Sequence, residues 1–228
     1  MKIPSLPLMM TLLCAAARAA DAPLPAARLA YADGRVTVES GGVKRPGKAG
    51  EALFSGDAIA TAQAATAVVE LADGSQLKLR ELSRVALDLP APGPSSITEA
   101  LLTLGGVFAK ITKRAPGSRF RVRAGSVLAS VKGTEFFVSF GRKARGGRDL
   151  WVCVNEGAVD VGTLALKNTI EVPHGRGVLI QSGRDLTKPQ AYNWTKALNW
   201  NMDPAAGALE DKTNLDAAYS DLLDQDYR

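Results

Sequence analysis

Apolar and polar residues alternate in short segments from Asp33 to Gln181. The alternating apolar positions are Val36/Val38, Ala67/Val69/Leu71, Leu77/Leu79, Val85/Leu87/Leu89, Val107/Ala109/Ile111, Phe120/Val122, Leu150/Val152/Val154, Val159/Val161 and Val178/Ile180. Side chains of a strand alternate between its two faces, so this period predicts strands with one buried face. Such segments recur about every 8–12 residues, which favours a mainly β chain, either an antiparallel β-sandwich or a β-solenoid-like domain.

Glycine-containing turns separate these segments. Asp73-Gly74 lies between two alternating runs, a strong short-range signal for a β-hairpin, and Glu156-Gly157 predicts a second hairpin. Pro90–Ser96 contains three prolines, which cannot donate to a strand ladder, so it predicts a loop that divides the β region into two halves.

The stretch VKGTEFFVSF, from Val131 to Phe140, loses its period. Apolar residues occupy odd positions up to Val131 and even positions from Phe136 onward. Because a shift of one residue flips the buried face, the segment between them must absorb an odd step. Two interpretations are open, a β-bulge at Gly133-Thr134 or a turn through Lys132–Glu135, and the strain-relieving glycine favours the bulge.

The character of the chain changes after Pro189. Tyr192, Trp194 and Trp200 lie close together, and Leu215, Tyr219, Leu222 and Leu223 fit a helical stripe. We therefore predict a β domain over residues 33–182 and a C-terminal tail over 190–228. The tail is expected to carry one short helix near 213–225 and to dock its aromatic residues on the β domain, or to bind a partner.

The first nineteen residues have the features of a signal peptide. Lys2 precedes an apolar run from Leu6 to Ala17, and small residues follow at Ala17 and Ala19. The run is short for a membrane span, and no later segment holds twenty apolar residues. We expect a periplasmic or secreted bacterial protein with no transmembrane segment after signal removal; lipidation of Cys14 is a weaker alternative.

Composition leaves few candidates for chemistry. The 228 residues have a formal charge of +5, with +7 in residues 20–189 and −4 in residues 190–228, and they contain one histidine. His174 lies in a glycine-rich turn, Cys153 is the only cysteine after signal removal, and no cysteine or histidine pair has metal-ligand spacing. We therefore predict no catalytic, cofactor or metal site, with Cys153 packed in a sheet and His174 exposed in its turn.

Two basic clusters are candidates for an anionic-partner surface. One lies on a single face of a predicted strand, and the other lies on a predicted hairpin tip. Their residues are Arg119, Arg121 and Arg123 on the strand, and Arg142, Lys143, Arg145 and Arg148 on the tip. Exposed charge also prevents strand edges from aggregating, so solvated charge is the other interpretation.

Four motifs, taken in order, resemble the FecR domain family. They are Gly50-x-x-Leu53-x-x-Gly56-Asp57-x-Ile59-x-Thr61; Ala67–Leu71 followed by Asp73-Gly74-Ser75-x-Leu77-x-Leu79; Leu104-x-Gly106-Val107 leading through Phe120-x-Val122 to Val131-x-Gly133-Thr134-x-Phe136-x-Val138; and Val152-x-Val154-x-x-Gly157-x-Val159-x-Val161. Together they cover about residues 33–182. The resemblance implies a β-rich periplasmic domain that acts through protein contacts, not catalysis.

In the founding members of that family, a cytoplasmic anti-sigma segment and a membrane helix precede the domain. Here only a signal-like segment precedes Asp33, so the chain is more similar to stand-alone exported FecR-domain proteins. The expected function is a non-catalytic module that binds a protein or cell-envelope partner, with no nucleic acid and no cofactor. The alternatives are a carbohydrate-active hydrolase, or an adaptor of a TonB-dependent transporter and sigma-factor system.

Overall fold

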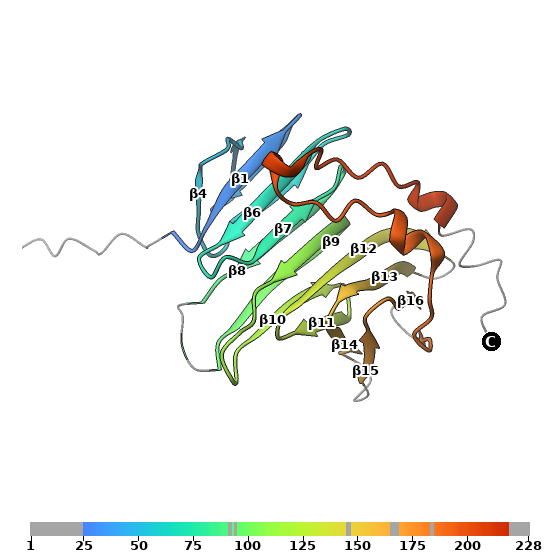
Figure 1. Ribbon diagram of the computed structural model, residues 1–228. Coiled ribbons are helices and arrows are strands. Elements are labelled where there is room, and N and C mark those ends of the chain that lie inside the picture. The colour runs from blue at the N-terminus through green and yellow to red at the C-terminus, as the bar shows by residue number, and fades with distance from the viewer. Residues whose placement is uncertain are drawn as a thin grey trace, which may run out of the picture.

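The structure, a computed structural model, describes residues 25–90, 93, 95–144, 147–164, 169–182 and 185–218 (Figure 1). Strands dominate it, as the alternation predicts. They are β1 (Ala27–Asp33), β2 (Val36–Ser40), β3 (Val43–Pro46), β4 (Ala52–Leu53), β5 (Ala58–Thr61), β6 (Thr66–Leu71), β7 (Gln76–Leu79), β8 (Arg84–Asp88), β9 (Ile97–Ile111), β10 (Arg119–Ala124), β11 (Val127–Val131), β12 (Thr134–Ala144), β13 (Gly147–Glu156), β14 (Ala158–Thr163), β15 (Thr169–Pro173), β16 (Gly177–Gln181) and β17 (Asp185–Leu186).

The strands form one continuous mixed sheet with two layers. Layer A runs in the order β4-β1-β6-β7-β9-β12-β13-β16-β17. Layer B runs in the order β3-β2-β5-β8-β9-β10-β11-β14-β15. The 15-residue β9 belongs to both, with its first part paired in layer B and its second part paired in layer A.

A glycine marks the change of layer within β9. Gly105 has a φ of +87°, and a Cβ placed on it would lie 2.2 Å from the Ser83 Oγ. Only glycine fits this backbone conformation and this approach, so Gly105, which lies between Leu104 and Gly106 of the third motif, permits the bend.

One hydrophobic core lies between the layers. It takes Leu29, Val69 and Val138 from layer A and Ile59, Val85 and Val161 from layer B, all of them 1% exposed or less. The mainly β prediction is confirmed, and the two facing layers correspond to the sandwich alternative. The pairing is antiparallel throughout the described strands except between β9 and β10, which run parallel.

The predicted hairpin at Asp73-Gly74 is confirmed. Strands β6 and β7 pair antiparallel across it, and Gly74 has a φ of +79°. The hairpin predicted at Glu156-Gly157 is wrong. Strand β13 pairs with β12 and β16 in layer A, whereas β14 pairs with β11 and β15 in layer B, so the chain changes layer at Gly157.

The period slip in VKGTEFFVSF has the same cause. Strand β11 ends at Val131 in layer B and β12 begins at Thr134 in layer A, separated by a bend at Lys132-Gly133. Neither a bulge at Gly133-Thr134 nor a turn through Lys132–Glu135 describes this passage between layers. A register irregularity does occur next to it, between Glu135 and Phe136 in the pairing of β12 with β13.

The C-terminal segment lies across the outer face of layer A (Figure 1). It contains the 3₁₀ helices η1 (Asn193–Ala197) and η2 (Pro204–Ala206) and one helical turn at residues 215–218. This turn lies within the predicted range 213–225 of the C-terminal helix, and Tyr219, Leu222 and Leu223 of its stripe lie outside the described residues. Within the described part of the chain, no helix has the length and apolarity needed to cross a membrane.

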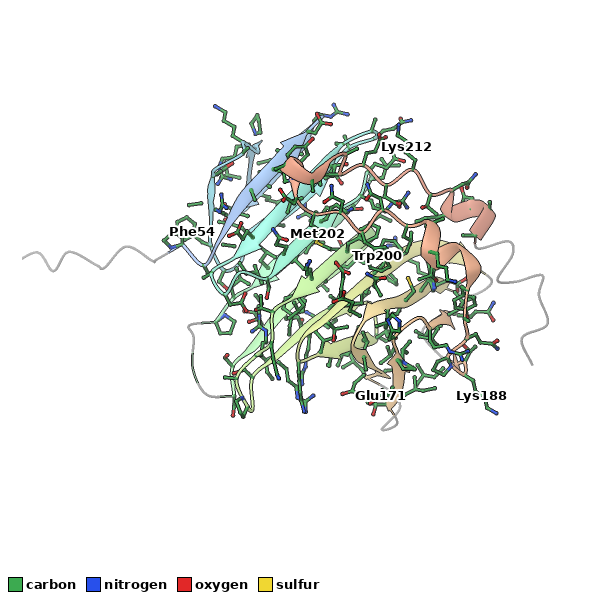
Figure 2. All side chains as sticks on the ribbon, viewed as in Figure 1. Phe54, Glu171, Lys188, Trp200, Met202 and Lys212 are labelled. Atoms are coloured by element: carbon green, nitrogen blue, oxygen red, sulfur yellow. The ribbon has the colours of Figure 1, made fainter. Side chains whose placement is uncertain are left out.

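A second hydrophobic cluster forms where this segment meets layer A. Phe108, Phe137, Trp151, Cys153 and Leu179 supply the sheet side. The segment covers them with Tyr192, Leu198 and Met202, and Trp200 packs against the same cluster (Figure 2). The rings of Phe108 and Trp200 meet edge to face with their centroids 5.3 Å apart. The expected docking of tail aromatics is therefore present for Tyr192 and Trp200.

Candidate functional site

Two aspartates in the turns of the first two motifs accept hydrogen bonds from backbone amides. Asp57 Oδ1 accepts a hydrogen bond from Ser40 Oγ at 2.6 Å, and Asp57 Oδ2 accepts one from the Phe54 amide at 3.0 Å. Asp73 Oδ1 accepts from the Ser75 amide, and its other carboxylate oxygen lies 2.7 Å from Arg114 Nη2. Both carboxylates thus have defined structural partners.

Two cations on β7 and its end hold the C-terminal segment. Lys78 is 1% exposed, and its Nζ donates to the carbonyls of Asn199 at 2.5 Å and Asn201 at 2.7 Å. The ammonium also lies 4.3 Å from the centroid of the Phe108 ring. Burial lowers the pKa of Lys78 to about 8, with the Asp211 carboxylate acting in the opposite direction.

Arg80 extends the same attachment. Its Nε lies 2.8 Å from Asp211 Oδ2, and its Nη2 donates to the carbonyls of Asp211 and Thr213. Alternation in QLKLR places Lys78 and Arg80 on the face opposite Leu77 and Leu79, which would ordinarily indicate solvent. The sequence gives no local sign that a segment more than 120 residues away covers that face.

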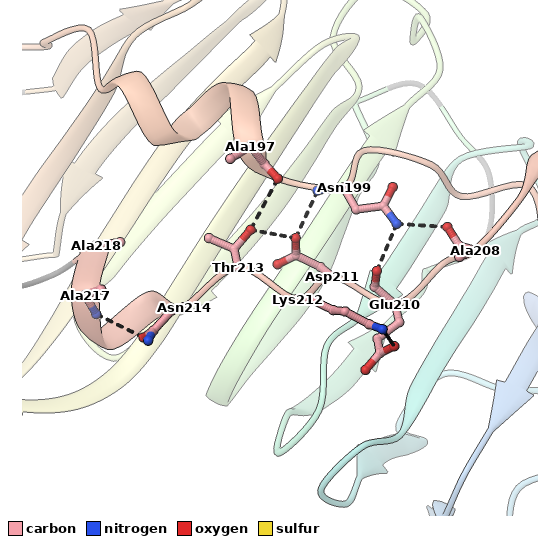
Figure 3. A pocket seen from close by; sticks show the side chains of 10 residues that line it. All are labelled: Ala197, Asn199, Ala208, Glu210, Asp211, Lys212, Thr213, Asn214, Ala217 and Ala218. Atoms are coloured by element: carbon pink, nitrogen blue, oxygen red, sulfur yellow. Dashed lines mark hydrogen bonds and ion pairs between the residues drawn. The ribbon is translucent and has the colours of Figure 1, made fainter.

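The segment is also bonded to itself. We call residues 198–214 the C-terminal loop; its outward part runs to η2 and its return part leads to the helical turn (Figure 1). Asn199 Nδ2 donates to the carbonyls of Ala208 and Glu210, and the Asn199 amide donates to Asp211 Oδ1 (Figure 3). Asn201 Nδ2 similarly donates to Gly207 and Ala208.

An open hollow of about 710 Å³ lies between these two parts of the C-terminal loop. Its lining residues are Ala197, Asn199, Ala208, Glu210, Asp211, Lys212, Thr213, Asn214, Ala217 and Ala218 (Figure 3). The carboxylate of Asp211 is turned to Arg80, Asn199 and Thr213, and Lys212 lies 3.3 Å from Glu210. The polar groups of the hollow therefore serve mainly to hold the loop.

A second opening of about 390 Å³ lies where the chain changes layer at Gly133 and Gly157. We call it the crossover cleft. It is lined by Lys110, Ile111, Lys113, Lys132, Gly133, Thr134, Glu135, Glu156 and Gly157. Thr134 Oγ1 donates to the Ala158 carbonyl at 2.9 Å, and this bond connects the segment that follows Gly133 to the segment that follows Gly157. The cleft was not foreseen, since its lysines belong to three separated segments.

Two glutamates of the crossover cleft face each other across strands. Glu135 pairs with Glu156 in the register of β12 and β13. Glycosidases need one carboxyl group kept protonated in an apolar environment beside an ionised one. Glu135 instead accepts a hydrogen bond from Asn155 Nδ2 and lies 4.0 Å from Lys110 Nζ, and Glu156 is exposed. The Glu135 carboxylate is thus engaged in contacts within the fold, and Glu156 faces solvent.

The turns and layer changes described above lie in a region that matches a known family. The model of the FecR protein family matches residues 57–160. Residues 57–160 are therefore recognised as a FecR domain. The match begins at the Asp57 turn and ends on β14, so the FecR domain includes the Asp73-Gly74 hairpin, the β9 bend and both layer changes. The resemblance drawn from the four sequence motifs is confirmed.

Solved structures share this fold. Two crystal structures of a "putative anti-sigma factor" from Parabacteroides distasonis match with TM-scores of 0.52 and 0.53. Their sequences are 18% and 17% identical to this chain, and each match covers 72% of this chain and 72% of the other. No curated protein matches the chain.

The predicted arginine face of the FecR domain is real but mixed in charge. Strand β10 buries Phe120 and Val122 and turns its three arginines outward. Arg119 Nη1 lies 3.8 Å from Asp160, and Arg123 Nε lies 2.5 Å from Glu99. Arg121 is half-buried and lies opposite Glu99 in the parallel register. Neighbouring acids therefore offset part of this charge.

The predicted basic hairpin tip joins β12 and β13. Their pairing continues to Ala144 and Gly147, which confirms the hairpin. Arg148 is exposed, donates to the Thr103 carbonyl at 3.2 Å, and places its guanidinium 5.9 Å from the Phe140 ring. Arg145 and the side chains of Arg142 and Lys143 lie outside the described residues. Anion binding by these residues stays a prediction.

His174 and Cys153 have the exposed and buried positions that the sequence predicts. His174 is exposed in the turn between β15 and β16, and its Nδ1 contacts the Asn155 carbonyl. Cys153 is fully buried in β13, and burial raises the pKa of its thiol well above the ordinary range. Among the described residues, no group of three or more histidine, cysteine or acidic residues could hold a metal ion.

Proposed function

We propose that this chain is a non-catalytic FecR-domain module of the bacterial periplasm that binds a protein partner in a signalling role. The observation that carries the proposal is the FecR domain itself, since the family to which it belongs is regulatory. Fold alone does not determine function, so the surfaces of the domain have to supply the specific argument.

The use of the signature residues supports a binding role. Asp57 and Asp73 hold turns, and Gly133 and Gly157 lie at the layer changes. Because these residues build the frame of the domain, we expect other surface side chains to make the recognition contacts. The exposed Arg148 on β13 and the outward arginines of β10 are charged groups available for such recognition.

A periplasmic location is supported by the apolar run in the first nineteen residues and by the envelope association of the family. We therefore expect a partner in the envelope, either a protein of the outer or inner membrane or an anionic envelope component. The adaptor role in a transporter and sigma-factor system is one form of this proposal, and the anti-sigma description of the structural relatives agrees with it.

The test is capture of partners from native envelope by the mature protein. A variant with Arg142, Lys143, Arg145 and Arg148 changed to alanine tests the tip, and a variant with Arg119, Arg121 and Arg123 changed to alanine tests β10. We expect a reproducible protein partner that one of these variants loses. Capture of the same partners by both variants would overturn the basic surfaces as the binding sites. Turnover of an envelope polysaccharide by the purified protein would overturn the non-catalytic proposal.

A further inference from the structure

The crossover cleft contains a charge arrangement that the fold does not require. Lys132, in the bend between β11 and β12, lies directly beside Lys113, because the Arg114 amide donates to the Lys132 carbonyl at 2.9 Å. A Cβ placed on Gly133 would lie only 3.0 Å from Lys113 Cα. The two lysines are thus close neighbours on adjoining backbone, and both side chains are exposed.

Like charges on adjoining backbone segments repel each other, as like charges opposite each other in a sheet do, and lower stability. Among the described residues, no carboxylate oxygen comes within ion-pair distance of either Lys113 or Lys132. Local conflicts of this kind, where a sequence works against its own fold, are expected at functional sites. The repulsion would be relieved by an anion placed between the two ammonium groups.

The acidic residues of the cleft do not provide that anion. Glu135 is 7% exposed and is occupied by Asn155 Nδ2 and Lys110. Glu156 is exposed on the strand opposite Glu135. Lys110 and Glu135 offset each other's charge. Lys113, Lys132 and Glu156 remain, so the residues that line the cleft carry a net positive charge.

The floor of the cleft is bare backbone. Gly157 has a φ of +79°, and a Cβ on it would lie 3.0 Å from the Gly133 carbonyl oxygen and 3.1 Å from Thr134 Oγ1. The backbone segments at Gly133 and Gly157 therefore approach each other closely, and the cleft beside them has a volume of about 390 Å³. The glycines of two FecR motifs thus shape the cleft besides permitting the layer changes.

We propose that the crossover cleft binds a phosphate group, held by Lys113 and Lys132 with Lys110 at its edge. Lysine binds phosphate as a point charge, and two lysines on adjoining backbone suit a group that carries nearly two negative charges. This inference goes beyond partner binding by the arginine surfaces, and either proposal can fail without the other. The source is a soluble phosphate or the phosphate of a lipid headgroup.

The experiment titrates the mature protein with inorganic phosphate at low ionic strength, using calorimetry and the melting temperature as readouts. The test variant is Lys113→Gln with Lys132→Gln. The control is Lys48→Gln with Lys196→Gln, which removes the same charge from exposed positions outside the cleft. We expect the test variant to lose at least about tenfold in affinity and the control to stay within about twofold of the parent. Glu156→Gln should tighten binding.

The phosphate-free proteins give an independent readout. Lys132→Gln alone should raise the melting temperature by about 1–2 °C at low salt, because it removes the repulsion from Lys113. A lower melting temperature would contradict the like-charge argument. Equal weakening of phosphate binding in the test and control variants, or no saturable binding by the parent, would overturn the site.

A second arm separates the two sources. Vesicles of phosphatidylcholine with one quarter phosphatidic acid are compared with vesicles of phosphatidylcholine alone in flotation. Retention on the phosphatidic acid vesicles that the Lys113/Lys132 variant loses assigns the site to a headgroup. Saturable binding of inorganic phosphate without vesicle retention assigns it to a soluble phosphate. Vesicle retention that the control variant loses equally would count against the cleft.

Discussion

Arg80 on layer A and Asp211 in the C-terminal loop form a buried ion pair, with Nε and Oδ2 2.8 Å apart and their side chains 9% and 1% exposed. The pair joins residues 131 positions apart and fixes the return part of the loop over β7. A buried pair contributes little net stability relative to apolar residues, but loss of one partner leaves an uncompensated charge.

We therefore predict that Arg80→Ala or Asp211→Ala lowers the free energy of unfolding by about 3 kcal/mol. Urea unfolding measures this loss. Arg28→Ala is the matched control, because the Arg28–Glu70 pair has a similar distance of 2.7 Å but side chains 56% and 31% exposed. The control should lose under about 1 kcal/mol. Equal losses in buried and exposed variants would show that the Arg80–Asp211 pair is not a special attachment.

The lowered pKa of Lys78 predicts that the free energy of unfolding rises with pH. Its pKa is lowered from 10.5 to about 8 in the folded protein, so between these values the unfolded chain binds more protons than the folded chain. The free energy of unfolding contributed by Lys78 therefore increases from about pH 8 to pH 10.5, by about 3 kcal/mol in all.

The measurement compares unfolding of the parent and of Lys78→Met at several pH values in this range. Cys153 acts in the opposite direction, because burial raises the pKa of its thiol in the folded state only. Both proteins contain Cys153, so the difference between them isolates Lys78. A difference that does not change with pH would contradict the lowered pKa.

Gly157, which lies between β13 in layer A and β14 in layer B, should not tolerate substitution. Gly157→Ala combines a φ of +79° with a Cβ 3.0 Å from the Gly133 carbonyl oxygen, and the obstructing atom belongs to backbone. We expect it to lose about 2–4 kcal/mol of unfolding free energy. Gly175→Ala is the control, since Gly175 has a φ of +71° with nothing within 4 Å, and should lose only about 1 kcal/mol. Equal losses would assign the whole effect to φ.

The C-terminal segment should protect Cys153 from thiol reagents. Cys153 lies in the cluster that Tyr192, Leu198 and Met202 cover. In a chain with Cys14→Ser, we expect no reaction of Cys153 under native conditions. A chain ending at Pro189 should react readily and should bind a hydrophobic dye, because Phe108, Phe137 and Trp151 lose their cover.

Lys196→Ala, an exposed substitution in η1, is the control for that truncation and should leave Cys153 protected. Protection of Cys153 in the truncated chain would show that the sheet alone buries the thiol.

Local signals in the sequence predicted the strands and the Asp73-Gly74 turn, because two-residue alternation and hairpin chemistry act over a few residues. They could not place β13 and β14 in different layers, since Glu156-Gly157 has the composition of a hairpin and only the partners of the strands distinguish the two cases. Lys78 was missed for a related reason. A lysine on the outer face of a strand signals solvent unless a distant segment covers it.

The candidate sites show the same limit. Alternation placed Arg119, Arg121 and Arg123 on one face, as the structure has them, but Glu99 and Asp160 come from other strands and could not be anticipated. Lys110, Lys113 and Lys132 belong to a strand end, a loop and a bend. Only the pairing of β9 with β12 brings them into one cleft.

The two layer changes also make β11–β14 a single two-stranded ribbon. Residues 127–131 pair with the strand that ends at Thr163, and residues 134–144 pair with the strand that begins at Gly147, in nearly continuous register. Both strands of the ribbon change which positions face the core, from Val131 to Phe136 on one and from Val154 to Val159 on the other. A one-residue deletion at Lys132-Gly133 would therefore turn the apolar side chains of β12 outward while β13 kept its own. Insertions and deletions in this ribbon should be tolerated at its tip, around residues 145–146, and not at its bend.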